Sequence, residues 1–128
     1  MIDGTAPRAI DRGNIYWVVL DTGEGPDAAI PHPYVVVQDD LFNHSRILTV
    51  VVCALTSNLR RVSETPGNVL LEPGEGDLPR QSVVEVSKVS SIEKVQLGEY
   101  IGALSQARVE EILAGMRFLQ ATWFNRQA

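Results

Sequence analysis

The feature that most constrains the fold is the run of apolar and β-branched residues from Leu48 to Thr56, LTVVVCALT. Branched side chains favour extended backbone because they are stiff at χ1 and pack well on a pleated surface. The run shows no alternation of apolar and polar residues, so both of its faces are expected to be buried, as in a central strand. It is also far shorter than the ~20 apolar residues that a membrane-spanning helix needs.

Shorter runs of similar character are separated by segments rich in glycine, proline and polar residues, which are typical of turns. We expect further strands at Ile15–Leu20, Tyr34–Gln38, Asn68–Glu72, Ser82–Val89 and Gly98–Leu104. Two glycines and three prolines between Asp21 and Pro33 predict a long loop there. Ser90 and Ser91 are expected to cap a short helical turn.

The end of the chain has the pattern of an amphipathic helix. Ser105 suits an N-cap, and Phe118 lies off the apolar stripe, which predicts a second apolar contact, for example with another subunit. The stripe itself follows helical spacing at Val109, Ile112, Leu113, Met116, Leu119 and Trp123. Six or seven short strands with one C-terminal helix predict a mainly β fold, a small barrel.

The length and composition indicate one domain. A chain of 128 residues with 45% hydrophobic residues forms a single core. We expect a flexible N-terminal arm at residues 1–11, one barrel domain at 12–124 and a tail at 125–128.

Several classes of protein are excluded. Cys53 is the one cysteine, so an intrachain disulfide and a cysteine-based metal site are excluded. The two histidines, His32 and His44, lack the paired spacing of zinc ligands, and no phosphate-binding glycine motif follows a strand. We therefore expect no cofactor and no metal. The chain shows neither a signal peptide nor a membrane span, so a cytoplasmic location is expected.

The charge is unevenly distributed. The formal net charge of −5 argues against broad binding to nucleic acid or to an anionic membrane. However, no acidic residue lies between Asp40 and Glu64, and this interval holds Arg46, Arg60 and Arg61. Such a segment has two interpretations, a solvated loop or a local groove for phosphate oxygens and bases.

A set of short motifs in a fixed order resembles the MazF/PemK family of toxins from toxin–antitoxin systems, over residues 12 to about 119. The motifs are Arg12-Gly13 before Ile15–Val18, Pro33 before VVV, Asn43, TVVV and LTS within 49–57, GDLPRQSVV at 76–84, SSI at 90–92 and LGEYIGALS at 97–105. Each motif is weak by itself, whereas their ordered combination is specific.

The resemblance implies an SH3-like β-barrel that forms homodimers and cleaves single-stranded RNA at short sequences without metal. In this chemistry the 2′-hydroxyl attacks the adjacent phosphate and leaves a 2′,3′-cyclic phosphate and a 5′-hydroxyl. The resemblance also implies a cognate antitoxin that blocks the RNA groove with a disordered tail.

Two positions are the expected catalytic residues. The family usually has arginine directly before the proline of its second strand, and this chain has His32 there. Imidazole exchanges protons near neutral pH, so the histidine suits a general base or acid, or else it is a loop residue without a role. Thr56 matches the family threonine and is expected to donate its hydroxyl to the scissile phosphate. Its alternative role is to cap the loop that follows.

The expected RNA-binding residues come from the same comparison. Ser57 and Asn58 would make polar contacts with RNA, and Arg60, Arg61 and Lys88 would bind its backbone. Two further departures from the family pattern are serines, Ser87 where an acid is common and Ser90 where an arginine is common. Of the aromatic residues, Tyr16 and Trp17 either pack inside or leave one ring to stack on a base.

Two other functions stay open. The first is a binding module for RNA or an antitoxin tail that has lost catalysis with the arginine. The second is a gyrase poison, because CcdB toxins share the fold, and only Trp123 points to it.

Overall fold

The computed structural model describes residues 8–20 and 30–127, with side chains as far as Ala121. The elements are β1 (Asn14–Val18), β2 (His32–Val36), α1 (Asp40–Asn43), β3 (Thr49–Thr56), η2 (Leu59–Ser63), β4 (Val69–Leu71), η3 (Glu75–Asp77), β5 (Ser82–Glu93), η4 (Lys94–Gln96), β6 (Leu97–Ala103) and α2 (Gln106–Gln127), where η marks a 3₁₀ turn. None of the helices among the described residues is long and apolar enough to cross a membrane.

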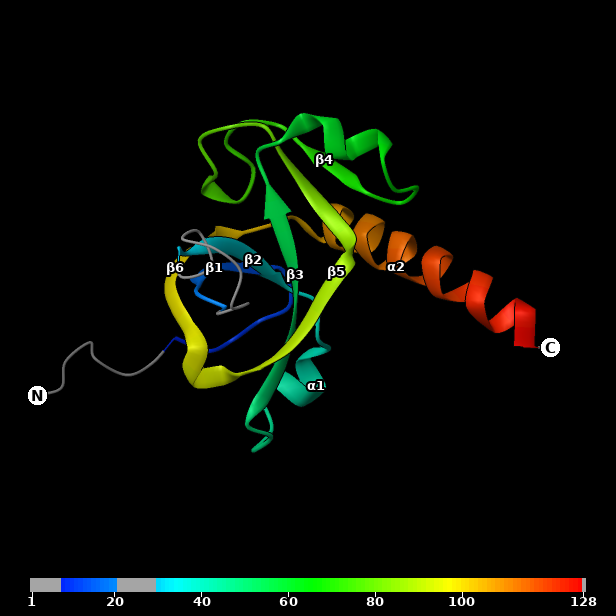
Figure 1. Ribbon diagram of the computed structural model, residues 1–128. Helices are drawn as coiled ribbons and strands as arrows, with labels where there is room; N and C mark the ends of the chain where they lie inside the picture. Colours follow the sequence, from blue (N-terminus) through cyan, green and yellow to red (C-terminus); the bar gives the residue numbers. More distant parts are fainter. Residues whose placement is uncertain (1–7, 21–29, 128) are drawn as a thin grey trace, which may run out of the picture.

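The strands form one antiparallel sheet in the order β4-β5-β3-β2-β1-β6, which curls strongly along its length (Figure 1). The prediction of a central strand is confirmed, because β3 pairs with β2 on one side and with β5 on the other. The predicted lack of alternation follows from this position, since each face of β3 is covered.

The two faces of the sheet bury two separate apolar clusters. Along β3, Val50 and Val52 belong to the cluster inside the curl of the sheet, and Cys53 and Leu55 belong to the cluster on the helix side. Successive side chains of a strand point to opposite faces, so a strand between two cores must be apolar at almost every position. Cys53 is fully buried, as a small apolar residue would be.

The helix α2 starts where the sequence predicts. The Ser105 side-chain oxygen accepts a hydrogen bond from the Arg108 backbone N–H at 3.2 Å, as an N-cap does. Ile112 is buried, and Val109, Leu113 and Met116 pack around it against the sheet. The predicted apolar stripe is therefore confirmed over its first three turns.

The far part of α2 projects beyond the sheet (Figure 1). Leu119 is 40% exposed there, and Phe118 is 59% exposed. The side chain of Trp123, on which the gyrase-poison hypothesis depended, lies outside the described residues.

The curl brings β6 against the turn that precedes β5. Gly102 of β6 touches the backbone of Gly76 in η3 so closely that a Cβ on Gly102 would overlap the Gly76 carbonyl oxygen. Arg108 of α2 donates to both carboxylate oxygens of Glu75 in the same turn, at 2.8 and 2.9 Å. The β6 edge of the sheet is thereby covered by η3, which agrees with the predicted small barrel with a C-terminal helix.

Two predicted boundaries are wrong. β5 continues to Glu93, because Ser90 and Ser91 pair with Val52 and Val51 instead of capping a helical turn. The turn comes later as η4, where the Glu93 and Gln96 side chains form a reciprocal capping box. β2 starts at His32, whose partner is Val18 of β1, so His32 is a strand residue and not a loop residue.

The N-terminal arm is described from Arg8 onward. The Arg8 guanidinium carbon lies 3.8 Å from the centre of the Tyr100 ring, and Ile10 packs against the inner apolar cluster. Residues 1–7 of the predicted arm and 21–29 of the predicted loop lie outside the described residues.

Candidate functional site

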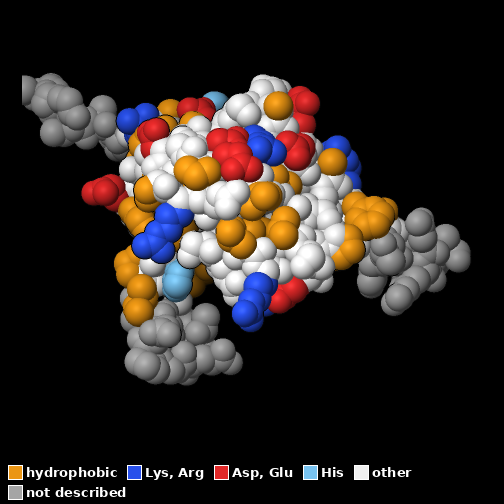
Figure 2. Space-filling view, turned by 90° about the horizontal axis from the view of Figure 1, so that it is seen from above, with side chains coloured by type: hydrophobic (Ala, Val, Ile, Leu, Met, Phe, Trp, Pro, Cys, Tyr) orange, Lys and Arg blue, Asp and Glu red, His pale blue; other side chains and the backbone are white. Residues whose placement is uncertain are grey.

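Basic side chains are scattered over the face of the molecule that Figure 2 shows, where they alternate with acidic and apolar side chains. Arg46 precedes β3 and Arg60 follows it, so the acid-free interval of the sequence does not converge on one site. The site therefore has to be found from local geometry.

A pocket of about 430 Å³, which we call the His32 pocket, brings together both expected catalytic residues. It is lined by Trp17, His32, Pro33, Leu55, Thr56, Ser57, Leu78, Pro79, Arg80 and Ser82. β2 and β3 are antiparallel neighbours, so the first residue of β2 and the last residue of β3 lie side by side at the same end of the two strands. The connection between η3 and β5 adds Leu78, Pro79 and Arg80 to the pocket lining at that end.

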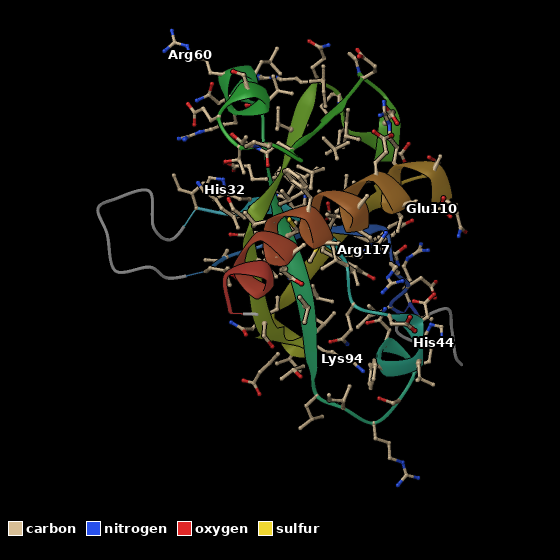
Figure 3. All side chains as sticks on the ribbon, turned by 90° about the vertical axis from the view of Figure 1, so that its right-hand side faces the viewer. His32, His44, Arg60, Lys94, Glu110 and Arg117 are labelled. Carbon is tan, nitrogen blue, oxygen red and sulfur yellow. The ribbon has the colours of Figure 1, made fainter. Side chains whose placement is uncertain are left out.

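His32 lies exposed at the mouth of the pocket. Figure 3 shows it on the same side of the molecule as Arg60 and away from His44. Within the described part of the chain, no hydrogen bond or ion pair of its imidazole is recorded. This geometry suits proton transfer with a bound molecule.

Thr56 has a structural role that leaves its hydroxyl proton available. Its Oγ1 accepts a hydrogen bond from the Asn58 backbone N–H at 3.2 Å, and the Asn58 side chain accepts from the Arg60 backbone N–H at 3.2 Å. These two bonds fix the turn between β3 and η2. A hydroxyl that accepts one bond still has its own proton to donate, so the capping role and the catalytic role of Thr56 are compatible.

Of the two aromatic residues, Tyr16 packs inside the protein and Trp17 leaves its ring partly exposed. Tyr16 is buried and meets Tyr100 edge-on, with ring centroids 5.6 Å apart. Trp17 is 41% exposed and lines the His32 pocket, where its ring is available for stacking on a base.

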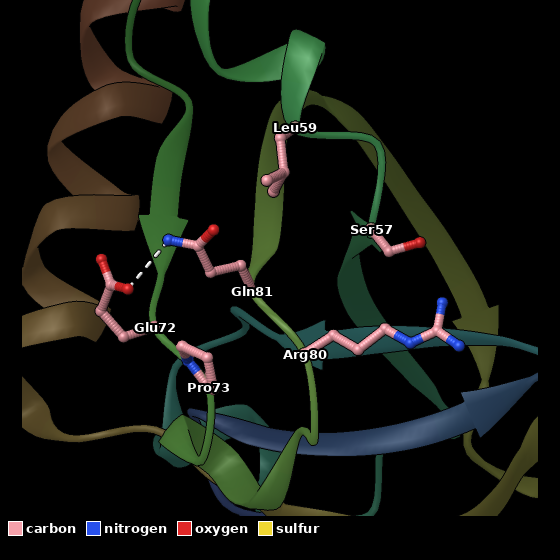
Figure 4. Close-up of a pocket in the computed structure, with 6 residues that line it drawn as sticks. All are labelled: Ser57, Leu59, Glu72, Pro73, Arg80 and Gln81. Carbon is pink, nitrogen blue, oxygen red and sulfur yellow. Dashed lines mark hydrogen bonds between the residues drawn. The ribbon is translucent and has the colours of Figure 1, made fainter.

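Arg80 is the residue that the sequence analysis missed. It lies in the motif GDLPRQSVV, three residues after Asp77 and outside the acid-free interval between Asp40 and Glu64. It lines both the His32 pocket and an adjoining hollow of about 520 Å³, which we call the Glu72 hollow (Figure 4). The Glu72 hollow is lined by Ser57, Leu59, Glu72, Pro73, Arg80 and Gln81. Nothing in the sequence pattern distinguishes this arginine, because its place depends on how the connection folds over the sheet.

Two of the predicted RNA-binding cations are paired with carboxylates. Arg61 Nη1 lies 2.7 Å from Glu64 Oε2, and Arg61 Nε lies 3.9 Å from Glu85 Oε1. Lys88 Nζ lies 3.5 Å from the same Glu85 oxygen. We call these four residues the Glu85 cluster. Arg60 is exposed and forms no recorded ion pair within the described residues, and none of these three cations lines the His32 pocket.

The Glu85 cluster is built on an irregularity of β5. Cys53 pairs with Val89 and Leu55 pairs with Val84, so the four residues 85–88 of β5 face Ala54 alone. This excursion buries the Glu85 side chain and carries the exposed Ser87, one of the two serine departures. Ser90, the other, lies half-buried in the regular ladder opposite Val52.

The buried carboxylate affects its neighbours. Burial raises the pKa of the Cys53 thiol to about 12, and the negative charge of Glu85 adds to this. Burial likewise raises the pKa of Tyr34, again with a contribution from Glu85. The Cys53 Sγ donates to the Glu85 backbone carbonyl at 3.0 Å. Burial, with a smaller contribution from the charge of Glu85, therefore favours the protonated forms of this thiol and this phenol.

His44 has carboxylate neighbours that its sequence spacing did not reveal. Its Nε2 lies 2.7 Å from Asp11 Oδ1, and Asp40 offers a further oxygen within 4.8 Å. Asp40 also accepts from the Arg12 backbone N–H at 2.7 Å, and this bond, the Asn43 side chain and nearby positive charge hold the pKa of its carboxyl below the usual value. These bonds attach α1 to the N-terminal segment, far from the His32 pocket along the sheet.

Comparison with known proteins identifies relatives over most of the chain. The family model described as PemK-like, MazF-like toxin of type II toxin–antitoxin system matches residues 11–119. Endoribonuclease MazF2 of Mycobacterium bovis and endoribonuclease MazF6 of Mycobacterium tuberculosis are each 35% identical over 108 residues, which cover 84% of this chain and 94% of each relative.

Solved structures of similar fold agree. An endoribonuclease from a mycobacterial species in complex with its cognate antitoxin has a TM-score of 0.68 at 23% identity, over 91% of this chain and 96% of that one. MazF from Deinococcus radiodurans has a TM-score of 0.68 at 17% identity, over 90% of this chain and 99% of that one. At these sequence identities, the similarity of the two structures to this chain shows a shared fold.

Proposed function

The chain belongs to the PemK-like, MazF-like toxin family of type II toxin–antitoxin systems, and we propose that it is the toxin of such a pair and cleaves single-stranded RNA at the His32 pocket. The observation that carries this proposal is the meeting of His32 and Thr56 in one pocket with an exposed tryptophan. This set supplies a proton-transfer group and a hydroxyl donor, which suit RNA cleavage without metal, and a stacking surface that suits the binding of a base.

The proposed reaction uses the RNA's own 2′-hydroxyl as the nucleophile. The imidazole of His32 accepts the 2′-hydroxyl proton, and the 2′-oxygen forms a bond to the adjacent phosphorus. The bond from phosphorus to the 5′-oxygen breaks as that oxygen takes a proton from water and leaves as a hydroxyl, and the hydroxide formed takes up the proton held by His32. Thr56 donates a hydrogen bond to a non-bridging phosphate oxygen as negative charge grows there. The products are a 2′,3′-cyclic phosphate and a 5′-hydroxyl.

The RNA strand is proposed to continue from the pocket over the turn between β3 and η2. Ser57 lines the pocket and Asn58 follows it, so both are placed for polar contacts. Arg60 offers a full charge to a phosphate. Arg61 and Lys88 offer a reduced one, because Glu64 and Glu85 already neutralise part of it.

We also propose a homodimer and a cognate antitoxin whose disordered tail covers the pocket. The dimer is supported by the exposed Leu119 on the projecting part of α2 and by exposed apolar side chains near the pocket, among them Trp17, Val19 and Ile30. The antitoxin is supported by the neighbour that was solved in complex with its own. Sedimentation equilibrium tests the dimer, and a single protomer mass at micromolar concentration would refute it.

The function is tested with purified protein and a pool of single-stranded RNAs in EDTA, with the product ends mapped. We expect 5′-hydroxyl ends at defined sequences, and a loss of about 10²-fold or more in His32→Ala and Thr56→Ala. Cleavage that requires a divalent cation, or that persists unchanged in both variants, would refute this mechanism.

A second candidate function, a binding module without catalysis, is favoured by two observations. The two cations of the Glu85 cluster are paired with carboxylates, and His32 stands where the family usually has arginine. Retained RNA or antitoxin binding with no cleavage of any RNA in the pool would establish this alternative.

A further inference from the structure

Arg80 occupies the boundary between two hollows, and this placement assigns it a role. It lines both the His32 pocket and the Glu72 hollow, and Ser57 is the one other residue they share. In Figure 4 its side chain extends beneath Ser57, while Glu72 and Gln81 lie on the other side of the hollow. A ligand in either hollow would therefore contact Arg80.

The backbone around Arg80 is held firmly. The Gln81 side-chain amide donates to Glu72 Oε1 at 2.9 Å, and the Glu72 backbone N–H donates to Glu75 Oε2 at 2.8 Å. Glu75 in turn accepts hydrogen bonds from Nε and Nη2 of Arg108 on α2. The Ser82 hydroxyl donates to the Arg80 carbonyl at 3.1 Å. The segment is therefore positioned before any ligand arrives, which lowers the cost of binding.

The Arg80 guanidinium itself is not neutralised. It is exposed, and no ion pair is recorded for it within the described residues, in contrast to Arg61 and Arg108. It is the only Lys or Arg among the residues that line the two described hollows. A planar guanidinium suits the bidentate binding of a phosphate. A phosphodiester at the boundary would place its scissile bond within the pocket of His32 and Thr56.

The Glu72 hollow has the chemistry of a base-binding subsite. Leu59 and Pro73 provide apolar surface, and the Glu72 carboxylate provides acceptors only. Oε1 of Glu72 already accepts from Gln81, so the second oxygen and a remaining lone pair are free. Among the bases, guanine presents two adjacent donors, N1–H and N2–H, which match a carboxylate.

We propose that Arg80 is a catalytic residue that binds the scissile phosphate, and that the Glu72 hollow holds the base of a nucleotide beside the cleaved bond, with a preference for guanine. The proposal rests on the proposed RNA cleavage. It explains how the site works with a histidine at position 32, since Arg80 supplies the positive charge from another part of the pocket lining. Phosphate binding and base recognition are then divided between the two hollows.

The role of Arg80 is tested with Arg80→Ala and Arg80→Lys, with Arg46→Ala as the matched control. Arg46 is also exposed but lies at the other end of β3, outside both hollows. We expect kcat/KM to fall about 10²-fold in Arg80→Ala, with partial recovery in Arg80→Lys, because lysine keeps the charge but not the fork. Equal rates in Arg80→Ala and Arg46→Ala would overturn the proposal.

Binding to an all-2′-O-methyl RNA, which lacks the nucleophile, separates this inference from the proposed function. The slope of log affinity against log salt concentration should fall by about 0.7 in Arg80→Ala, the value for one lost phosphate contact on a single strand. If wild-type protein cleaves no RNA, the proposed function fails, yet this slope still tests phosphate binding. An unchanged slope overturns the role of Arg80 in binding even where wild-type cleavage is normal.

The base preference is tested by sequencing the products of a randomised RNA pool. We expect guanine to be enriched beside the cleaved bond for the wild-type protein, and Glu72→Gln to reduce that enrichment about tenfold. Absence of guanine enrichment in the wild type, or an equal enrichment in Glu72→Gln with normal melting temperature, would overturn the assignment of the hollow.

Discussion

The His32 pocket and the Glu85 cluster lie on neighbouring parts of the same sheet and both contain arginine, but they differ in what their cations face. In the pocket, Arg80 faces two open hollows. In the cluster, Arg61 and Lys88 face the buried Glu85 carboxylate. The number of basic residues is therefore a poor guide to where an anion binds. What matters is the charge that remains after the nearest carboxylates are counted.

The difference also concerns burial. Glu85 is held on an irregular excursion of β5, over a thiol and a phenol that it helps to keep protonated. The pocket, in contrast, is lined by strand ends and by a connection that η3 and α2 hold in place. The first region is a structural centre with paired charges, and the second is an open site whose arginine has no ion pair among the residues that the structure describes. The following predictions test that contrast.

The largest expected difference between the two regions is in catalysis. Thr56→Val removes the pocket hydroxyl at similar volume and is expected to lower cleavage about 10²-fold or more, whereas Thr56→Ser retains most of it. Arg61→Ala removes a charge that is already paired and should lower cleavage no more than about threefold. Single-turnover cleavage of one RNA substrate measures all three. A greater loss in Arg61→Ala than in Thr56→Val would reverse the contrast.

The buried side of the Glu85 cluster predicts slow labelling of Cys53. A thiol pKa of about 12 in the folded chain, against an ordinary value of 9.0, gives about 10³-fold less thiolate at pH 8 than in the unfolded chain. Alkylation in buffer and in denaturant measures the ratio. Glu85→Gln should accelerate labelling of the folded chain, since a negative neighbour is removed, and equal rates in buffer and denaturant would refute the burial argument.

Removal of the cluster's carboxylate should make its cations available. Glu85→Gln leaves Arg61 and Lys88 without their shared partner, so we expect RNA affinity to rise about tenfold at low salt, with a steeper salt dependence. Fluorescence anisotropy with a non-cleavable RNA measures this change, and Glu99→Gln on β6, outside both regions, is the control. An affinity that stays equal to the control would show that these cations do not reach RNA.

The smallest expected effect concerns the support of the pocket. Arg108→Ala removes the partner of Glu75 and should destabilise the fold by roughly 1 kcal/mol, because the pair is partly exposed. The guanidinium of Arg108 lowers the pKa of Glu75, so its stabilisation is present above the unfolded value of about 4.3 and is lost as pH falls through the folded pKa. Urea unfolding at pH 7 and pH 3 checks both, and the variant should differ from wild type less at pH 3.

Much of the fold follows from the sequence. The run at 48–56 predicts a central strand because only a strand between two cores is apolar on both faces, and the helix after Ser105 follows from its cap and its stripe. The boundary errors have a common cause. Ser90 and Ser91 are favourable caps by themselves, but pairing with β3 satisfies their backbone more completely. His32 likewise becomes the first residue of β2 because it pairs with Val18 in β1.

The succession of strands along the chain, the central place of Leu48–Thr56 and the family all follow from the sequence, because they depend on local propensity and on motifs in a fixed order. The order of the strands in the sheet comes from the structure. The sequence placed Thr56 at a strand end but His32 in a loop, and the pairing of His32 with Val18 is what puts His32 at the strand end beside Thr56. Which cations have a carboxylate partner among the described residues depends on the folded structure. Arg61 meets Glu85, and Arg108 meets Glu75, across long stretches of chain, while Arg80 meets no carboxylate among the described residues. An electrostatic partner is set by distance in space, which the spacing of residues in the sequence does not give.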